Sequence, residues 1–165
     1  MAPDGTFWLA DEYGPSLFHV SQHGQVLERV VPKNYLNTDN RHILARLPEV
    51  LNSRKANRGF EAITYYNGSL YAFLQSPLKI STPSLLTRII VYNPTLKKTT
   101  GQFAYFMEGN GSDKIGDAIH WRDDKFLVIE RDDQKGNNSK KKIFMLDFRA
   151  TSMSSSPAPK TNSDQ

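Results

Sequence analysis

The sequence predicts an all-β protein, a β-propeller of about two and a half to three four-stranded antiparallel blades. Two observations support this fold. Short apolar segments alternate with turn signals along most of the chain, and one unit recurs. The unit is clearest at 57–78, NRGFEAITYYNGSLYAFLQSPL, where a strand of period two precedes Asn67-Gly68 and a second apolar run. Asn-Gly favours the left-handed backbone of a tight hairpin turn.

The same order of features returns at 115–132, IGDAIHWRDDKFLVIERD, and the stretch 3–15 looks like its second half. Each copy has an acid near the start of one strand, a polar turn, an aromatic residue in the next strand and polar groups at its end. A β-sandwich also contains many short strands, but it does not explain this repeated order. A repeated four-stranded antiparallel unit is typical of a propeller blade.

The expected strands follow from period-two alternation between Gly, Pro and Asn turns. In chain order they cover 6–10, 17–21, 25–31, 60–65, 70–74, 87–92, 101–107, 118–121, 126–130 and 142–148. One short helix is expected near 47–54, because apolar residues fall at helical spacing from Ile43 to Leu51 and Pro48 suits a first helical turn. Residues 1–149 form the predicted domain, and 150–165, rich in Ser, Pro and Lys, are expected to be a disordered tail.

The predicted ring is incomplete. The middle copy has four strands, the first copy lacks its first strand, and the third copy lacks its last. Closed propellers have about four to eight blades. We therefore expect either a fragment of a longer propeller or a chain that associates with itself through its open blade edges.

Composition excludes several classes of function. The 165 residues carry a net charge of +4 and contain no cysteine, so neither a disulfide nor a thiolate metal site is present. No apolar stretch approaches the ~18 residues of a membrane span, and Met1 leads directly into Pro3-Asp4-Gly5 without a signal segment. Aromatic residues alternate with aliphatic ones inside strands, which indicates a core and no nucleic-acid partner. No P-loop is present, and we expect no organic cofactor.

Candidate functional residues come from aligning the copies, because equivalent residues of successive blades converge around one channel. The alignment gives two acidic sets near the ends of the strands. They are Glu61 with Asp117, and Asp11 with Gln75 and Glu130. Basic residues stand beside them, namely Arg58, Lys114 and Arg131.

Such a combination suits a phosphate ester. Carboxylates are the preferred ligands of Ca²⁺, or of Mg²⁺, and guanidinium groups hold phosphate oxygens. We therefore expect Glu61, Asp117 and Glu130 as metal ligands or general base, with Arg58 and Arg131 on the phosphate. The alternative is structural: acids and arginines at strand ends also pair with each other and accept hydrogen bonds from loops.

Four motifs together resemble the phytase-like family, described as an esterase-like, phosphodiesterase-related β-propeller domain. They are DGTFWLADEYGP at 4–15, NRGFE at 57–61, LQSPL at 74–78 and FLVIERD at 126–132. The resemblance covers roughly residues 4–148. It implies that the acids within the motifs are functional, and with Asp117 from the alignment of the copies the predicted metal ligands are Asp11, Glu12, Glu61, Asp117 and Glu130.

The resemblance also implies that whole members are about twice this length and are often exported. Compared with that pattern, we expect this chain to lack the N-terminal blades and an export signal. The sequence thus leaves two functional hypotheses. The first is metal-assisted hydrolysis of a small phosphate ester or other anionic ligand. The second is a non-catalytic propeller fragment that binds a ligand or a protein through its channel face or open edge.

Overall fold

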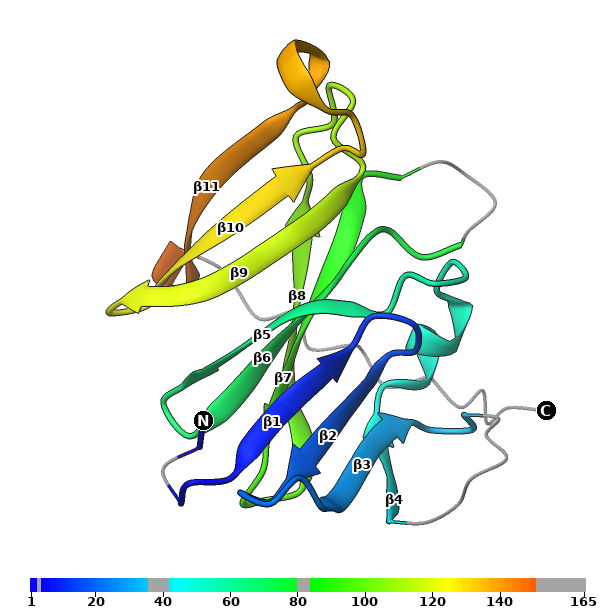
Figure 1. The fold of residues 1–165 in the computed structure, drawn as a ribbon, viewed down its shortest axis with the longest axis vertical. Helices are drawn as coiled ribbons and strands as arrows, with labels where there is room; N and C mark the ends of the chain where they lie inside the picture. The colour runs from blue at the N-terminus through cyan, green and yellow to red at the C-terminus, as the bar shows by residue number, and fades with distance from the viewer. Residues whose placement is uncertain (3, 36–41, 80–83, 151–165) are drawn as a thin grey trace, which may run out of the picture.

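The protein folds into three β-sheets that are stacked in sequence order (Figure 1). The computed structural model describes residues 1–2, 4–35, 42–79 and 84–150. These residues confirm the all-β prediction, since they contain strands and only three short 3₁₀ helices. Across these described ranges, no helix is long and apolar enough to cross a membrane. The predicted tail lies, from residue 151 onward, outside the described residues.

Sheet A contains β1 (Phe7–Asp11), β2 (Ser16–Val20), β3 (Val26–Pro32) and β4 (Ile43–Leu47). The first three strands are antiparallel, and β4 joins β3 in parallel. The helix expected near 47–54 is only a 3₁₀ helix, η1 (Glu49–Ser53), and Ile43 and Leu44 lie in a strand instead. The reason is Pro48, which pushes the preceding residue into extended backbone, while Leu47 and Leu51 are both buried.

Sheet B contains β5 (Phe60–Tyr66), β6 (Ser69–Leu74), β7 (Leu86–Asn93) and β8 (Lys98–Phe106), all antiparallel. The predicted turn between β5 and β6 is confirmed, because Asn67 and Gly68 have φ of 45° and 74°. Both angles belong to the left-handed region that a two-residue hairpin needs.

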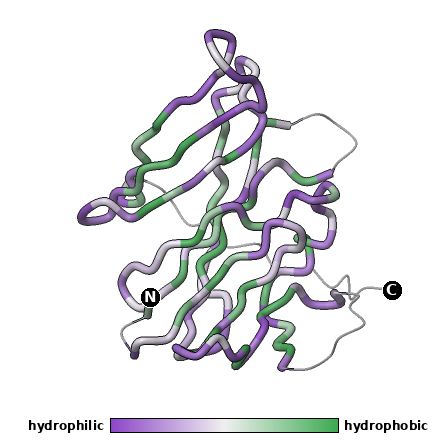
Figure 2. Tube along the Cα trace, viewed as in Figure 1, coloured by the Kyte–Doolittle hydropathy of each residue, from purple (hydrophilic) through white to green (hydrophobic). Residues whose placement is uncertain are grey.

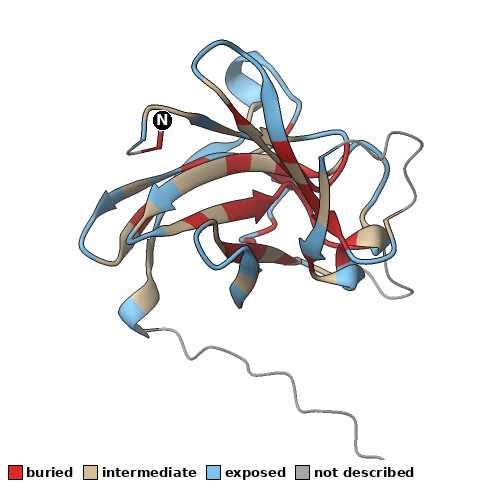
Figure 3. Ribbon diagram, turned by 90° about the horizontal axis from the view of Figure 1, so that it is seen from below, coloured by how far each residue is buried: buried red, intermediate tan, exposed pale blue. Residues whose placement is uncertain are grey.

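Sheet C contains β9 (Lys114–Arg122), β10 (Lys125–Arg131) and β11 (Lys141–Asp147), with the 3₁₀ helices η2 (Gly136–Asn138) and η3 (Phe148–Ala150) beside them. Hydrophobic residues follow the strands, whereas hydrophilic residues gather in the turns (Figure 2). Buried residues concentrate where neighbouring sheets face each other (Figure 3).

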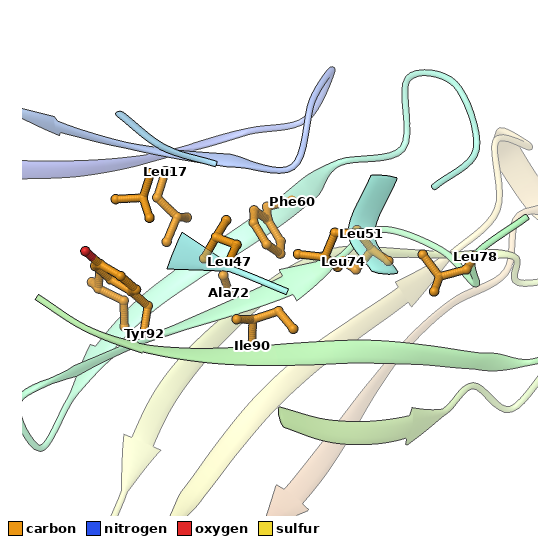
Figure 4. Close-up of a cluster of buried hydrophobic side chains, with 11 residues drawn as sticks. Leu17, Leu47, Leu51, Phe60, Ala72, Leu74, Leu78, Ile90 and Tyr92 are labelled. Carbon is orange, nitrogen blue, oxygen red and sulfur yellow. The ribbon is translucent and has the colours of Figure 1, made fainter. Parts of the chain in front are cut away.

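Two apolar clusters hold the sheets together. The cluster between sheets A and B includes Leu17, Phe60, Ala72 and Ile90, and it also takes in Leu51 of η1 (Figure 4). The cluster between sheets B and C consists mainly of Ala62, Phe73, Ile89, Tyr105, Met107, Ile115, Ala118, Phe126 and Val128. Sheet B is therefore buried on both faces, and sheets A and C are each buried on one.

Strand ends of successive sheets are also joined, because the start of β5 bonds to the end of β1 and the start of β9 bonds to the end of β6. β5 lies beside both β1 and β9. The backbone N–H of Gly59 donates to the carbonyl of Glu12 at 2.5 Å, and that of Ile115 donates to the carbonyl of Gln75 at 2.7 Å. These two bonds are counterparts, so Glu12 and Gln75 occupy equivalent places in sheets A and B.

Two β-bulges correct the alignment of the copies by one residue. Glu61 is the extra residue between Phe60 and Ala62, and Gly116 is the extra residue between Ile115 and Asp117. Glu61 therefore corresponds to Gly116, and Asp117 corresponds to Ala62. A shift of one residue moves a side chain to the opposite face of a sheet.

The second strands show the same shift. Leu74 of β6 lies on the face toward sheet A, and Val128 of β10 lies on the face toward sheet B. Glu130 follows Val128 by two residues and is buried on the same face, so Leu74 and Glu130 are equivalent. Gln75 then corresponds to Arg131, and the expected equivalence of Gln75 with Glu130 is wrong.

Candidate functional site

The candidate site lies where the corrected equivalents meet, at the ends of β1, β6 and β10 and the starts of β5 and β9. Its side chains are Glu12, Arg58, Glu61, Gln75, Lys114 and Arg131. The end-to-end backbone bonds of Gly59 and Ile115 bring these strand ends together. A chain that is continuous through three sheets thus places residues up to 119 positions apart, Glu12 and Arg131, in one cluster.

Glu61 is the centre of this cluster. One carboxylate oxygen, Oε1, accepts a hydrogen bond from Nη2 of Arg131 at 3.1 Å, and the other, Oε2, accepts one from Nε2 of Gln75. The same Gln75 nitrogen donates to Oε1 of Glu12 at 2.7 Å. Glu61 is 12% exposed in its side chain. One amide therefore joins two carboxylates, and one guanidinium neutralises the more buried of them.

Two glycines make room for this arrangement. A Cβ at Gly116 would lie 2.9 Å from Cδ of Arg131, so the bare backbone of the bulge lets the arginine side chain cross sheet C toward Glu61. A Cβ at Gly59 would lie 2.4 Å from the carbonyl oxygen of Asp11, which explains how β5 approaches the end of β1 so closely.

Three cations gather around Asp113 and Asp133, and one of them, Arg131, also binds Glu61. Nη1 of Arg131 is 3.1 Å from Asp133, Lys114 also contacts Asp133, and Nη2 of Arg58 is 3.7 Å from Asp113. The hydrogen bond from Lys114 is the main reason that the pKa of Asp133 is lowered, and Arg131 and Arg58 add to it. Asp113 and Asp133 are mostly exposed, whereas Lys114 is buried. The cations are thus fixed and their acidic partners are peripheral.

Arg58 also has an unused donor. Its Nη1 is buried and has no hydrogen-bond partner within the described residues. A buried guanidinium nitrogen without a partner is costly, and an anion oxygen would satisfy it.

Glu130 lies outside this cluster and is buried. Its carboxylate accepts hydrogen bonds from the Tyr105 hydroxyl at 2.7 Å, the Glu108 backbone at 3.0 Å and the Ser112 hydroxyl at 3.2 Å. Burial, followed by the hydrogen bond to Glu130, raises the pKa of Tyr105. These contacts fix the loop after β8 against sheet C.

The carboxylate of Asp11 also has its hydrogen-bond partners close by in the fold. It accepts hydrogen bonds from the backbone of Tyr13 and Gly14 and from the Ser16 hydroxyl, and it pairs with Arg29 at 3.3 Å. It therefore closes the turn between β1 and β2.

Asp117 lies on the outward face of sheet C. It is exposed and accepts a hydrogen bond from the neighbouring Ala118 backbone. Of the predicted site residues, the structure brings together Glu12, Arg58, Glu61 and Arg131; Asp11, Asp117 and Glu130 are placed elsewhere. The sequence reasoning missed Asp113 and Asp133, although each stands beside a basic residue at a strand end.

The oxygen atoms available for a metal ion are few. No group of three His, Cys, Asp or Glu residues that could hold a metal occurs in the described part of the chain. The amide nitrogen of Gln75 donates to both Glu12 and Glu61. The Oε1 of Gln75 is buried and has no hydrogen-bond partner among the described residues. Two carboxylates therefore meet at the amide nitrogen of Gln75, and its amide oxygen is not directed at them.

Comparison with known proteins agrees with the four motifs. Residues 1–163 match the family described as "Phytase-like: Esterase-like activity of phytase". A curated relative, an "Uncharacterized secreted protein" of Arthroderma benhamiae, is 30% identical over 92 residues. That match covers 46% of this chain and 18% of the fungal protein. Because the family match covers nearly the whole sequence, the chain belongs to the phytase-like family.

Proposed function

We propose that the three sheets are successive blades of a β-propeller, and that the cluster around Glu61 is part of a site for hydrolysis of phosphoric esters. The observation that carries this proposal is the position of Glu61, held between the Gln75 amide and Arg131, whose other guanidinium nitrogen contacts Asp133 together with Lys114. Membership of a family named for esterase-like activity of phytase supports it.

The basic residues suit a phosphate group. Arg58 offers its unpartnered Nη1, and Arg131 offers a guanidinium that now contacts the exposed Asp133. Ion pairs with exposed carboxylates contribute only about 0–1 kcal/mol. A phosphate can therefore replace Asp133 and Asp113 at little cost and gain paired donors from the arginines.

Phosphate binding would also change Glu61. When a phosphate engages Arg131, Glu61 loses part of the positive charge beside its Oε1. Glu61 could in that state orient a water molecule and accept its proton.

The residues also fit a divalent cation in part. After a half-turn of its amide, Gln75 would present Oε1 to the carboxylates of Glu12 and Glu61. The three residues would then supply three of the roughly six to eight oxygens that Ca²⁺ takes. A bound Ca²⁺, or Mg²⁺, would neutralise charge on the phosphate oxygens. The remaining ligands would come from the substrate, from water or from further blades.

Hydrolysis of a chromogenic phosphate monoester or diester, with Ca²⁺ or Mg²⁺ added, tests the proposal. We expect metal-dependent turnover that Glu61→Gln abolishes without unfolding the chain. The matched control is Glu108→Gln, which removes an ion pair with Lys142 outside the Glu61 cluster. Absence of turnover by the unmodified chain with either metal, or equal turnover by Glu61→Gln, would reject it.

A second function has a specific observation in its favour. Glu12, Glu61, Asp11 and Glu130 all have protein donors on their carboxylates, as residues of a purely binding or structural site would. On this alternative the chain is a non-catalytic propeller fragment that binds an anionic ligand without turning it over. Binding of inorganic phosphate without hydrolysis of any ester would favour it. The secreted fungal relative supports export as the setting for either function.

A further inference from the structure

Three asparagines lie in the sequence pattern that accepts an N-linked glycan. The pattern is Asn, any residue except Pro, then Ser or Thr, and it occurs at Asn67-Gly68-Ser69, Asn110-Gly111-Ser112 and Asn137-Asn138-Ser139. A fourth triplet, Asn93-Pro94-Thr95, has Pro in the middle and does not qualify. Because a three-residue pattern also arises by chance, the surroundings of each asparagine decide whether a glycan fits there.

Each of the three asparagines is exposed in a connection between strands. Asn67 lies in the turn between β5 and β6, Asn110 in the loop between β8 and β9, and Asn137 in η2 between β10 and β11. A glycosylated asparagine has to face water, because its glycan is bulky and hydrophilic. All three positions meet this condition.

The side-chain amides of the three asparagines are also free to react. They make no hydrogen bond within the part of the chain that the structure describes. Other asparagines do: the Asn52 amide donates to the Lys33 carbonyl at 2.8 Å, and the Asn93 amide oxygen accepts from the Leu96 backbone at 2.8 Å. Attaching a glycan to the three free amides would therefore break no contact of the fold.

The space around the three amides differs. A Cβ built at Gly68 or at Gly136, the chain neighbours of Asn67 and Asn137, meets no described atom within 4 Å. A Cβ at Gly111, beside Asn110, would lie 2.9 Å from Nζ of Lys140, which also donates to the Asn110 carbonyl. The loops that carry Asn110 and Asn137 therefore lie side by side, apart from the β5–β6 turn (Figure 1).

We propose that Asn67, Asn110 and Asn137 carry N-linked glycans. This rests on export, which the proposed function infers from the secreted fungal relative. In the reaction, each amide nitrogen attacks the anomeric carbon of an oligosaccharide that is linked to a lipid diphosphate. The new C–N bond replaces the C–O bond to the diphosphate, the amide loses one proton, and the lipid diphosphate leaves with the bonding electrons.

Ser112 determines when Asn110 can be modified. Recognition of the triplet includes the Ser hydroxyl. In the folded chain Ser112 is buried, and its hydroxyl contacts the Gly109 carbonyl at 2.9 Å and Glu130 at 3.2 Å. The Asn110 triplet can therefore be recognised only before this loop folds, while the chain is being exported.

Expression of the chain behind a cleavable export signal in a eukaryotic host tests the inference. We expect a mass above the 18.7 kDa of the polypeptide by three glycans. Peptide-N-glycosidase, which leaves aspartate in place of each glycosylated asparagine, should return the polypeptide mass. Peptide mass spectrometry should then find aspartate at positions 67, 110 and 137. Because transfer precedes folding, the medium and the cell extract are both measured, and the test does not depend on folding.

Substitutions identify the modified residues. Asn67→Asp, Asn110→Asp and Asn137→Asp should each remove one glycan, and aspartate also tolerates the left-handed backbone of Asn67 and Asn110, whose φ are 45° and 50°. Ser69→Ala should remove the same glycan as Asn67→Asp, whereas Ser69→Thr should retain it. Asn93→Asp is the matched control, because its triplet contains Pro, and it should retain all three glycans.

Three results would overturn the inference. The first is a bare polypeptide mass of the unsubstituted chain after its export signal has been cleaved. The second is a glycan mass that persists when all three asparagines are replaced. The third is failure of the chain to enter the export route even behind this signal, which would remove the premise of export. All readouts are masses, so they are independent of whether the chain hydrolyses phosphate esters.

Discussion

Glu61 and Glu130 are glutamates with opposite surroundings. Glu130 is fully buried and accepts hydrogen bonds only from neutral groups, two hydroxyls and a backbone N–H. Glu61 lies at a bulge, pairs with Arg131 and shares the Gln75 amide with Glu12. The first carboxylate has all its partners fixed by the fold. The second shares its partners with other carboxylates, since Arg131 also contacts Asp133 and Gln75 also contacts Glu12.

The difference separates a strand-end acid that is part of the packing from the one at the centre of the proposed site. Both residues were predicted as catalytic from their place in the repeat. Burial on the face toward sheet B makes Glu130 part of the packing, whereas the extra residue of a bulge places Glu61 beside cations. Variants of the two residues should therefore affect different properties.

The largest effect on stability is expected for Glu130→Ala. The change leaves the Tyr105 hydroxyl, the Ser112 hydroxyl and the Glu108 N–H without their acceptor, and each buried unpaired group costs about 1–3 kcal/mol. We expect a loss of roughly 3 kcal/mol or more in the free energy of unfolding, measured in urea. Glu61→Ala should lose about 1 kcal/mol or less; equal losses would remove the distinction.

Tyr105→Phe should have the next largest effect. It removes one donor to Glu130 and leaves the ring packed, so we expect a loss of about 1–2 kcal/mol. Chemical denaturation at pH 7 measures it. A variant as stable as the unmodified chain would show that Glu130 is satisfied by its other two donors.

The same tyrosine predicts a dependence on alkaline pH. Burial and Glu130 raise the folded pKa of Tyr105 above the unfolded value of about 10. The folded state then holds the proton more tightly, so this stabilisation is complete below pH 10 and is lost as pH rises above it. Tyr105→Phe should flatten the fall in stability above pH 10. An unchanged slope would assign the fall to other tyrosines.

Gly116→Ala should affect the site more than the fold. The added methyl group would lie 2.9 Å from Cδ of Arg131 and push this flexible side chain away from Glu61. We expect hydrolysis to fall by about 10- to 100-fold, because small misplacements of site groups have effects of that size. The free energy of unfolding should change by less than about 1 kcal/mol. Full activity would mean that Arg131 is not needed at Glu61.

The smallest effect is expected for Asp117→Asn. Its exposed carboxylate accepts a hydrogen bond from the adjacent backbone and lies on the outward face of sheet C, away from Glu61. Stability should change by less than about 0.5 kcal/mol, and hydrolysis should be unchanged. A large loss of hydrolysis would restore Asp117 to the site.

Much of the fold could be predicted because local signals agree with it. The Asn67-Gly68 turn and the alternation in β5 and β6 give the central hairpin directly. β4 could not be predicted in the same way, since Ile43 to Leu51 also fits helical spacing, and the pairing with β3 acts together with Pro48 to select a strand.

The site was predictable only in part. Glu61 and Arg131 stand out as charges at strand ends, but a bulge adds one residue without any mark in the sequence. The alignment of copies therefore slipped by one, and Asp117 was paired with Glu61. The donors of Glu130 come from residues 105–112, which are distant along the chain, so its burial could not be read from the motif.

The most direct test compares Glu61→Gln with the unmodified chain in two assays, Ca²⁺-dependent hydrolysis of a phosphate ester and unfolding in urea. We predict that turnover falls at least about 100-fold, the lower range for loss of a general base, while the free energy of unfolding stays within about 1 kcal/mol. Turnover by the variant equal to that of the unmodified chain would contradict the assignment of Glu61 as the central residue of the site.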